Sequence, residues 1–228
     1  TSEDGTIDLS KLPVGAYVVT ELECPGYVID DAQRIIHLDP NENAEFVFTN
    51  SKLPSLTLTK TSSDGTPLAD GIITWEGLEP GVYSLVETAT VSDHILDARE
   101  HHIQLFPGRD STIDLENDRR PNLTVVKRDA DSGAPIADTV FLVEAADGHS
   151  VDEIRTGPDG SATLENLLPG VYQISEKSVP SPYLMDAEPQ LVTLYPNRDH
   201  TVYFENHKAP TIEIIKENSI THERLSNV

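Results

Sequence analysis

Apolar and polar residues alternate with a period of two along most of the chain, in short runs separated by turn residues. Runs such as 56–60, 113–117 and 202–206 place an apolar side chain at every second position. This is the period of a β-strand with one buried face, because successive side chains of a strand point to opposite faces. Asp-Gly pairs at 64–65, 147–148 and 159–160 predict hairpin turns. We therefore expect an all-β fold of short strands that form β-sandwiches.

Three stretches of this pattern align with one another, each with the same three landmarks. A segment of fixed length runs from a glycine to a glutamate 16 residues later, as in Gly5–Glu21, Gly71–Glu87 and Gly160–Glu176. An apolar run ends 29 or 30 residues later in an asparagine: Asn50, Asn117 or Asn206. A further apolar run ends ten residues after that in a lysine: Lys60, Lys127 or Lys216. The constant order and spacing indicate an internal repeat.

Short polar segments that each contain a proline separate the repeats, at residues 51–55, 118–122 and 207–211. The expected parts are the C-terminal part of a first repeat at 1–52, a second repeat at 53–119, a third and complete repeat at 120–208, and the first strand of a fourth at 209–228. Linkers this short restrict the motion of neighbours, so we expect tandem sandwiches arranged as a semi-rigid rod. The partial repeats at either end indicate a fragment of a longer protein.

The second repeat is shorter than the third. Lys60 and Asn117 lie 57 positions apart, whereas Lys127 and Asn206 lie 79 apart. The deficit falls between residues 70 and 71, where the third repeat has residues 139–159 and a predicted core strand. Either the second repeat is naturally trimmed or a segment is missing there. The second interpretation is favoured, because deleting a core strand should uncover the sandwich.

The lysine, glutamate and asparagine landmarks share strand faces with apolar side chains. In the second and third repeats each stands two residues after a core-facing apolar residue. Burying a lone lysine or glutamate is costly, and the usual response is a shift toward the neutral form. The residues concerned are Lys60, Glu87 and Asn117 in the second repeat, and Lys127, Glu176 and Asn206 in the third.

These three residue types can react with one another. A neutral amine is a nucleophile, and a neutral glutamic acid can donate one proton and accept another. The asparagine carboxamide is then an electrophile that releases ammonia. The sequence thus predicts a Lys–Asn amide formed once, without turnover. Two alternatives remain open at this point: the side chains end their strands and reach water, or they form a buried ion pair without covalent chemistry.

Residues 123–137, 166–176 and 202–206 resemble the Cna-B type repeat, also called the SpaA-like or prealbumin-like domain, of Gram-positive adhesins and pilins. The resemblance extends over essentially the whole chain. It implies an Ig-like or prealbumin-like sandwich with an isopeptide bond from the first-strand lysine to the last-strand asparagine, catalysed by the glutamate. The implied pairs are Lys127–Asn206 with Glu176, and Lys60–Asn117 with Glu87.

Two predicted cross-link residues have no partner within their own repeat. Asn50 has Glu21 as its catalytic counterpart but lacks a preceding lysine strand, and Lys216 lacks a glutamate and an asparagine after it. The simplest interpretation is that the repeats continue beyond the given sequence. An alternative is that the strand in 210–228 completes the first repeat of another molecule by strand addition.

Composition excludes several kinds of partner. The net charge of −23, from 39 acidic and 16 basic residues, would repel nucleic acid and anionic lipid. No window of 18 apolar residues occurs, so we expect no membrane insertion in this part of the protein. The single cysteine, Cys24, excludes an intrachain disulfide and has acidic neighbours. Histidines 101, 102 and 200 lack metal-ligand spacing, and we expect no metal and no cofactor.

These expectations favour a structural stalk or spacer of a secreted bacterial adhesin or pilus-like protein, extracellular and anchored to the cell wall, rather than a turnover enzyme. Its partners would be the neighbouring repeats of the same chain. One alternative is a module that binds a host matrix protein or glycan, and another is an accessory β-sandwich of a secreted enzyme. Near-equivalent repeats favour the spacer, because a specific site should make one repeat different from the others.

Overall fold

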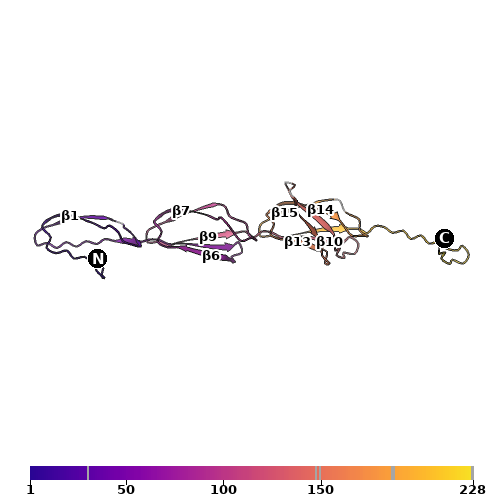
Figure 1. Ribbon diagram of the computed structural model, residues 1–228, viewed down its shortest axis with the longest axis horizontal. Coiled ribbons are helices and arrows are strands. Elements are labelled where there is room, and N and C mark those ends of the chain that lie inside the picture. Colours follow the sequence, from indigo (N-terminus) through magenta and orange to yellow (C-terminus); the bar gives the residue numbers. More distant parts are fainter. Residues whose placement is uncertain (30, 147, 149, 186–187, 227–228) are drawn as a thin grey trace. The chain divides into compact units, whose positions relative to one another are not determined.

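The computed structural model describes residues 1–29, 31–146, 148, 150–185 and 188–226, and this part of the chain contains strands and no helix (Figure 1). The all-β prediction is confirmed. No described segment forms a helix that could cross a membrane. The strands are β1 (Gly15–Thr20), β2 (Tyr27–Ile29), β3 (Gln33–Leu38), β4 (Asn50–Lys52), β5 (Leu56–Ser62), β6 (Pro67–Trp75), β7 (Gly81–Val86), β8 (Glu100–Leu105), β9 (Ser111–Asn117), β10 (Leu123–Asp129), β11 (Val140–Ala145), β12 (Ser150–Arg155), β13 (Ser161–Leu164), β14 (Gly170–Ser178), β15 (Gln190–Leu194) and β16 (His200–Asn206).

The chain forms two compact units. The first contains residues 1–91 and 96–117, and the second contains residues 92–95 and 118–228. Residues 92–95 belong to the second unit because their backbone pairs with residues 118–120, as in the bond from the Ile95 amide to the Asp118 carbonyl at 2.8 Å.

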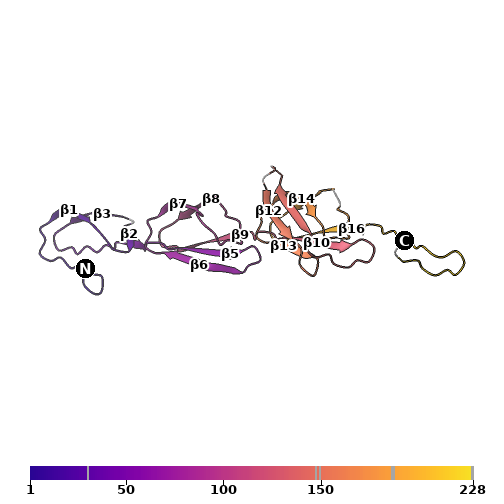
Figure 2. The ribbon, with the colours of Figure 1, turned by 45° about the vertical axis from the view of Figure 1, so that its right-hand side comes forward.

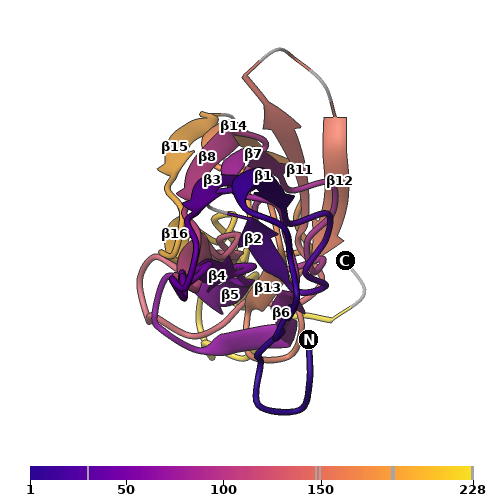
Figure 3. The ribbon, with the colours of Figure 1, turned by 90° about the vertical axis from the view of Figure 1, so that its left-hand side faces the viewer.

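The second unit is a two-sheet sandwich. One sheet has the strand order β13-β10-β16, with β10 parallel to β16. The other sheet has the order β12-β11-β14-β15, whose four strands are labelled in Figure 3, and is antiparallel throughout. Both sheets contribute to one apolar core, in which the rings of Phe141 and Phe204 lie 4.8 Å apart. The predicted core strand within 139–159 is confirmed, because Phe141 and Val143 on β11 are fully buried. The buried core residues are Leu123, Val125, Phe141, Val143, Ile154, Tyr172, Ile174, Val192, Leu194, Val202 and Phe204.

The first unit contains smaller sheets. Strands β6, β5 and β9 form one sheet in that order, with β5 parallel to β9 (Figure 2). The other pairs are β7 with β8, β1 with β3, and β2 with β4, and all three are antiparallel. The arrangement of β5, β9, β7 and β8 repeats that of β10, β16, β14 and β15, so the sequence repeat is also a structural repeat.

The short second repeat lacks a counterpart of β11 and β12 among residues 53–119, all of which the structure describes. Strand β6 spans residues 70 and 71, where its register with β5 shifts and Asp70 has a φ of 56°. Gly71 is required there, since a Cβ atom would lie 2.6 Å from the carbonyl oxygens of Lys60 and Leu68. Ile73 and Trp75 lie opposite Leu58 and Leu56, on the face of this sheet that points to the core, and are 46% and 37% exposed. The missing strands thus leave this sandwich partly uncovered, as expected from the sequence.

The predicted Asp-Gly hairpins have different outcomes. The pair at 64–65 joins the antiparallel neighbours β5 and β6, and that prediction is confirmed. The prediction for 159–160 is wrong, because this turn joins β12 to β13, which lie in different sheets. Strand β13 pairs with β10 instead, so the turn carries the chain across the sandwich. Residue 147 of the remaining pair lies outside the described residues.

A tyrosine closes the same loop in each repeat. Its hydroxyl group donates a hydrogen bond to the carbonyl oxygen four residues earlier, at 2.7 to 2.8 Å. This bond fixes the turn that leads into the strand bearing the glutamate landmark. The pairs are Tyr17 with Pro13, Tyr83 with Glu79, and Tyr172 with Leu168.

Candidate functional site

Lys127 is fully buried in the second unit. It lies on the central strand of its sheet, on the same face as Leu123 and Val125, and its Nζ atom is 5.9 Å from the centre of the Phe204 ring. An ammonium group removed from water in this way requires close polar partners, because desolvation of a charge costs several kcal/mol.

The parallel register of β10 and β16 brings Asn206 to this amine. Lys127 is opposite Phe204 in the ladder, and Asn206 lies two residues further along on the same face. The Lys127 Nζ atom donates a hydrogen bond to Asn206 Oδ1. A nucleophilic nitrogen therefore touches the carboxamide group that it could attack, although the two residues are 79 positions apart in the sequence.

Glu176 completes this site from the opposite sheet. It lies on β14 opposite Phe141 of β11, and its side chain is fully buried. One carboxylate oxygen, Oε2, is 3.6 Å from Lys127 Nζ, and the other, Oε1, accepts a hydrogen bond from Asn206 Nδ2 at 2.7 Å. The carboxylate thus bridges the amine and the amide nitrogen that would leave. A group in this position can accept a proton from one and deliver it to the other.

The structure also brings the three residues of the second repeat together. Lys60 Nζ is 3.2 Å from Glu87 Oε1, and Asn117 Nδ2 donates to Glu87 Oε2 at 2.8 Å. The Lys60 and Glu87 side chains are 13% and 11% exposed, whereas those of Lys127 and Glu176 are 0% exposed. The difference follows from the absence of a strand equivalent to β11 over this site.

The pKa of Glu87 is lowered. Burial raises this pKa, but hydrogen bonds from the Asn117 side chain and from the Asp97 backbone amide at 2.8 Å, together with the ion pair to Lys60 at 3.2 Å, outweigh it. The surroundings of Glu87 therefore favour its ionised form, whereas the sequence predicts a neutral glutamic acid. The physical reason is that two hydrogen-bond donors and the Lys60 ammonium stabilise the carboxylate more than partial burial destabilises it. A neutral amine here must arise by proton transfer from Lys60 to Glu87.

The contribution of Asp97 was missed by sequence reasoning, although a signal for it exists. An Asp-Ala pair follows each glutamate landmark by ten residues, beginning at Asp31, Asp97 and Asp186. The Asp97 amide bonds Glu87, and its carboxylate accepts from the Arg99 guanidinium at 2.7 Å. Asp186 lies outside the described residues.

The first repeat has an incomplete version of the site. Asn50 Nδ2 donates to Glu21 Oε1 at 2.6 Å, which repeats the asparagine–glutamate contact of the other two. The remaining oxygen atoms, Glu21 Oε2 and Asn50 Oδ1, are buried and have no hydrogen-bond partner within the described part of the chain. Lys216, the unpaired lysine predicted from the sequence, is exposed in the second unit.

A second buried polar group, Asp129, lies two residues beyond Lys127 and was also missed. Its Oδ2 atom accepts from the Tyr183 hydroxyl at 2.9 Å and lies 3.0 Å from Lys208 Nζ. Its Oδ1 atom accepts from the backbone amides of residues 131 and 132. The pKa of Asp129 lies well below its usual range because its carboxylate accepts hydrogen bonds from the Ser132 amide and then from Lys208 and Tyr183. The cluster holds the segment after Asn206 against the turn after Lys127.

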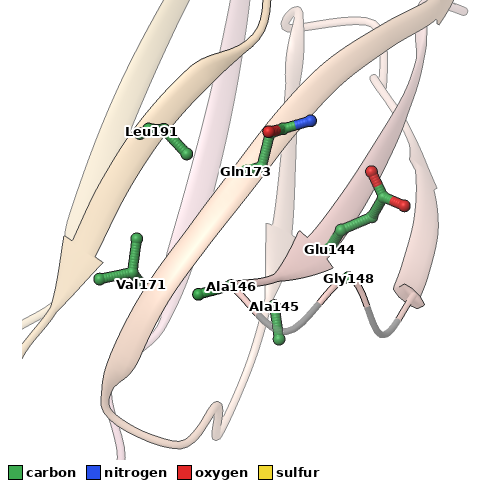
Figure 4. A pocket seen from close by; sticks show the side chains of 7 residues that line it. All are labelled: Glu144, Ala145, Ala146, Gly148, Val171, Gln173 and Leu191. Carbon is green, nitrogen blue, oxygen red and sulfur yellow. The ribbon is translucent and has the colours of Figure 1, made fainter.

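An open hollow of about 300 Å³ lies over β11, β14 and β15 and is lined by Glu144, Ala145, Ala146, Gly148, Val171, Gln173 and Leu191 (Figure 4). Val171 and Gln173 alternate along β14 with the core-facing Tyr172 and Ile174, so the hollow is on the outer face of that sheet. Among the described residues, no three His, Cys, Asp or Glu side chains are grouped as metal ligands would be.

Residues 121–208 match the family described as SpaA, prealbumin-like fold domain. The collagen adhesin of Staphylococcus aureus is 32% identical over 118 residues, which cover 48% of this chain and 10% of that protein. Colossin-A of Dictyostelium discoideum is 24% identical over 184 residues, which cover 68% of this chain and 2% of that protein. The chain therefore spans only a tenth or less of the length of these relatives.

Solved structures of low sequence identity are similar as well. The Bacillus anthracis TIE protein has a TM-score of 0.46 and 21% identity, over 86% of this chain and 43% of that chain. GBS52, the minor pilin of Streptococcus agalactiae, has a TM-score of 0.38 and 19% identity, over 64% of this chain and 68% of that chain. On the strength of the family match, residues 121–208 form a SpaA-type domain of prealbumin-like fold.

Proposed function

We propose that this chain is part of the structural stalk of a bacterial cell-surface adhesin or pilus-like protein, and that Lys–Asn isopeptide bonds lock its sandwiches. The observation that carries the proposal is the buried contact of Lys127 with both Asn206 and Glu176. A surface adhesin or pilus role is supported by the match to the SpaA family and by the similarity to the S. aureus adhesin.

The bond forms by transfer of the lysine amine to the asparagine side chain. Glu176 accepts a proton from the Lys127 ammonium, and the freed amine attacks Cγ of Asn206. Glu176 then delivers that proton to Nδ2 of Asn206, and the Cγ–Nδ2 bond breaks to release ammonia. The ammonia takes up the second proton lost from the lysine nitrogen and leaves as ammonium. The product is an amide between Nζ and Cγ, and Glu176 is again a carboxylate. The reaction happens once per site, so the chain is not a turnover enzyme.

The cross-link has a mechanical consequence. Strands β10 and β16 are parallel neighbours, and the chain enters the sandwich along the first and leaves along the second. Tension applied at the two ends would shear this pair apart, because only backbone hydrogen bonds hold the strands in register. A bond between Lys127 and Asn206 carries the load past the residues between them. The fold is then protected from extension, which suits a stalk.

The same proposal covers the organisation and location of the chain. The parts at 1–52, 53–119, 120–208 and 209–228 are successive Cna-B-like repeats in a rod, each with its neighbours in the chain as partners. The rod is extracellular and belongs to a protein anchored to the cell wall. Covalent cross-links replace the disulfides that a chain with one cysteine cannot form within itself.

Intact mass spectrometry of the denatured chain tests the proposal. We expect the wild-type mass to be lower than the sequence mass by two ammonia molecules, one for each complete set of residues. The Glu176→Gln variant should show a mass deficit of only one ammonia molecule, because the glutamine keeps the side-chain shape but cannot act as the proton acceptor. Glu205→Gln, an exposed neighbour of Asn206, is the matched control and should leave the mass deficit unchanged. A wild-type mass equal to the sequence mass refutes the cross-links.

A further inference from the structure

A residue outside the lysine, glutamate and asparagine set holds the carboxylate of the second site. Oε2 of Glu87 accepts two hydrogen bonds at 2.8 Å, one from Asn117 Nδ2 and one from the backbone amide of Asp97. The other oxygen, Oε1, is 3.2 Å from Lys60 Nζ. The carboxylate cannot rotate about its last bond without breaking both hydrogen bonds to Oε2. The Asp97 amide thus helps to decide which oxygen faces the amine.

The side chain of Asp97 is itself held from two sides. Arg99 donates two hydrogen bonds to it, from Nε to Oδ1 at 2.7 Å and from Nη2 to Oδ2 at 2.8 Å. His101 Nε2 lies 3.1 Å from the same Oδ2. We call the side chains of Arg99 and His101 the Asp97 clamp. Because a bidentate arginine pair fixes orientation as well as charge, the clamp anchors the Asp97 backbone where its amide meets Glu87.

The register of β7 and β8 explains why these groups meet. His101 is opposite Leu85 in the ladder, and the next pair in the same register is Glu87 with Arg99. Asp97 lies in the loop that leads into β8. One short segment therefore supplies the amide that binds the glutamate, the carboxylate that anchors this amide, and both side chains of the clamp.

The third repeat has different residues at the two clamp positions. When the ladders β7–β8 and β14–β15 are aligned by register, Glu188 and Gln190 occupy the places of Arg99 and His101. A glutamate repels an aspartate, and a glutamine has no charge with which to attract it. The clamp thus distinguishes the second site, where the Glu87 side chain is 11% exposed, from the fully buried third site.

We propose that Asp97 is a positioning residue for the Lys60–Asn117 cross-link. Its amide, held in place by the clamp, orients the Glu87 carboxylate between the amine and the carboxamide. Oε1 then accepts the proton of the Lys60 ammonium while Oε2 stays beside the nitrogen that leaves. The Nζ–Cγ bond forms, the Cγ–Nδ2 bond breaks and ammonia is released, as at the third site. The inference rests on the proposed function, because it assigns a role within the same reaction.

This role has a signature in the pH dependence of the reaction. Glu87 must be ionised to accept a proton, so the rate falls when it is protonated. Burial raises the pKa of Glu87, and the Asn117 side chain, then the Asp97 amide, then Lys60 lower it. Loss of the amide bond would move the acid limb of the pH–rate profile up, whereas loss of the Asp97 charge alone would move it down. The charged and titratable side chains that the described residues place around this carboxylate are those of Lys60, Asp97, Arg99 and His101.

Asp97→Asn and Arg99→Ala in the full chain test the proposal. Each chain is purified unfolded, with its sequence mass intact, and is refolded at a series of pH values. Mass spectrometry of digests then follows the cross-linked peptides of the second and third sites over time. Trp75 is the single tryptophan and lies in the second repeat, so its fluorescence gives the folded fraction by which the rate is normalised.

In Asp97→Asn the acid limb of the second site should move up by about one pH unit, as expected for the loss of a hydrogen bond to a charged group. At a fixed pH on that limb the reaction is then about tenfold slower. Arg99→Ala should cause a smaller shift in the same direction, because His101 still contacts Asp97. The third site should keep its profile in both variants. Glu100→Gln, which removes an exposed carboxylate from β8, is the matched control and should change neither site.

The direction of the shift decides the outcome. A downward shift in Asp97→Asn, or none, overturns the positioning role. A rate that decreases by one factor at every pH also overturns it, because a merely structural effect leaves the acid limb in place. In these cases the wild type still forms both cross-links, and the proposed function stands. A wild-type chain that never forms the Lys60–Asn117 bond refutes the proposed function at this site instead.

Discussion

Replacing Asn206 with alanine removes the electrophile of the third repeat while the buried Lys127–Glu176 ion pair remains. The cross-link closes a loop between residues 79 positions apart. In the loop-entropy treatment used for disulfides, closing a loop of that size stabilises the folded state by about 4.5 kcal/mol. For a unit of this size, such a loss lowers the midpoint of thermal unfolding by roughly 20–35 °C.

Differential scanning calorimetry of the full chain measures this effect. The transition of the second unit should move down, and that of the first unit should stay in place, because the substitution touches only the second. Glu205→Ala is the matched control on the same strand, and as an exposed substitution it should change stability by less than about 0.5 kcal/mol. A parallel mass measurement should show that the variant retains the ammonia deficit of the second repeat only.

The reasoning is refuted by a midpoint for Asn206→Ala that lies close to that of the control. A small decrease of a few degrees would also count against a covalent bond. Loss of the Asn206 hydrogen bond to Glu176 alone, about 1–3 kcal/mol, already lowers the midpoint by roughly 4–24 °C. Only a decrease larger than this range, together with the loss of one ammonia deficit in the mass, distinguishes a cross-link from a buried ion pair.

Three further predictions concern the second site and the surroundings of the third. After refolding, the Lys60 bond should form more slowly than the Lys127 bond because water reaches Glu87; the reverse order in a mass time course contradicts this. The pKa of Asp129 is lowered in the folded state, so its ionised form stabilises the fold fully above about pH 4, and this stabilisation is lost as the pH falls through the folded-state pKa. In the variant Asp129→Asn, the free energy of unfolding measured with urea should therefore depend less on pH in the acid range. Gly160→Ala should lower the free energy of unfolding by roughly 3 kcal/mol and Gly133→Ala by about 1 kcal/mol, because only at Gly160 would the added Cβ atom lie 2.5 Å from a carbonyl oxygen. Equal decreases for the two variants in urea unfolding would contradict this reasoning.

The three sites form a series of decreasing completeness. The third has all three residues fully buried beneath β11, the second has all three residues without that cover, and the first has only the glutamate and the asparagine. The series lets one chemistry be compared within one chain. If burial promotes the reaction, the yield of cross-link should be higher at the third site than at the second.

The loss of a single pair of strands has effects on both packing and electrostatics. Without a counterpart of β11, the side chains of Lys60 and Glu87 are 13% and 11% exposed, so water reaches Glu87. Glu176 instead lies against Phe141 in a closed core. The sequence difference between residues 70 and 71 thus changes the environment of a residue 17 positions away in the chain.

Sequence by itself determined which side chains face inward. The parity of a strand is local, so the alternation around Lys127, Glu176 and Asn206 predicts their common face without knowledge of the partner strands. The constant spacing of the landmarks likewise predicts equivalent repeats, because equal separations place equal residues on equal strands. For this reason the landmark strands and the candidate site residues follow from local patterning alone.

Only the tertiary structure decided which strands are neighbours and how deeply each site is buried. The parallel pairing of β10 with β16, the crossing of the sandwich at residues 159–160, and the ionised state of Glu87 all depend on contacts between segments distant in sequence. The same is true of the Asp129 cluster, whose partners Tyr183 and Lys208 lie far along the chain. Pairing and burial are set by the packing of the whole unit, and alternation within one strand carries no information about that packing.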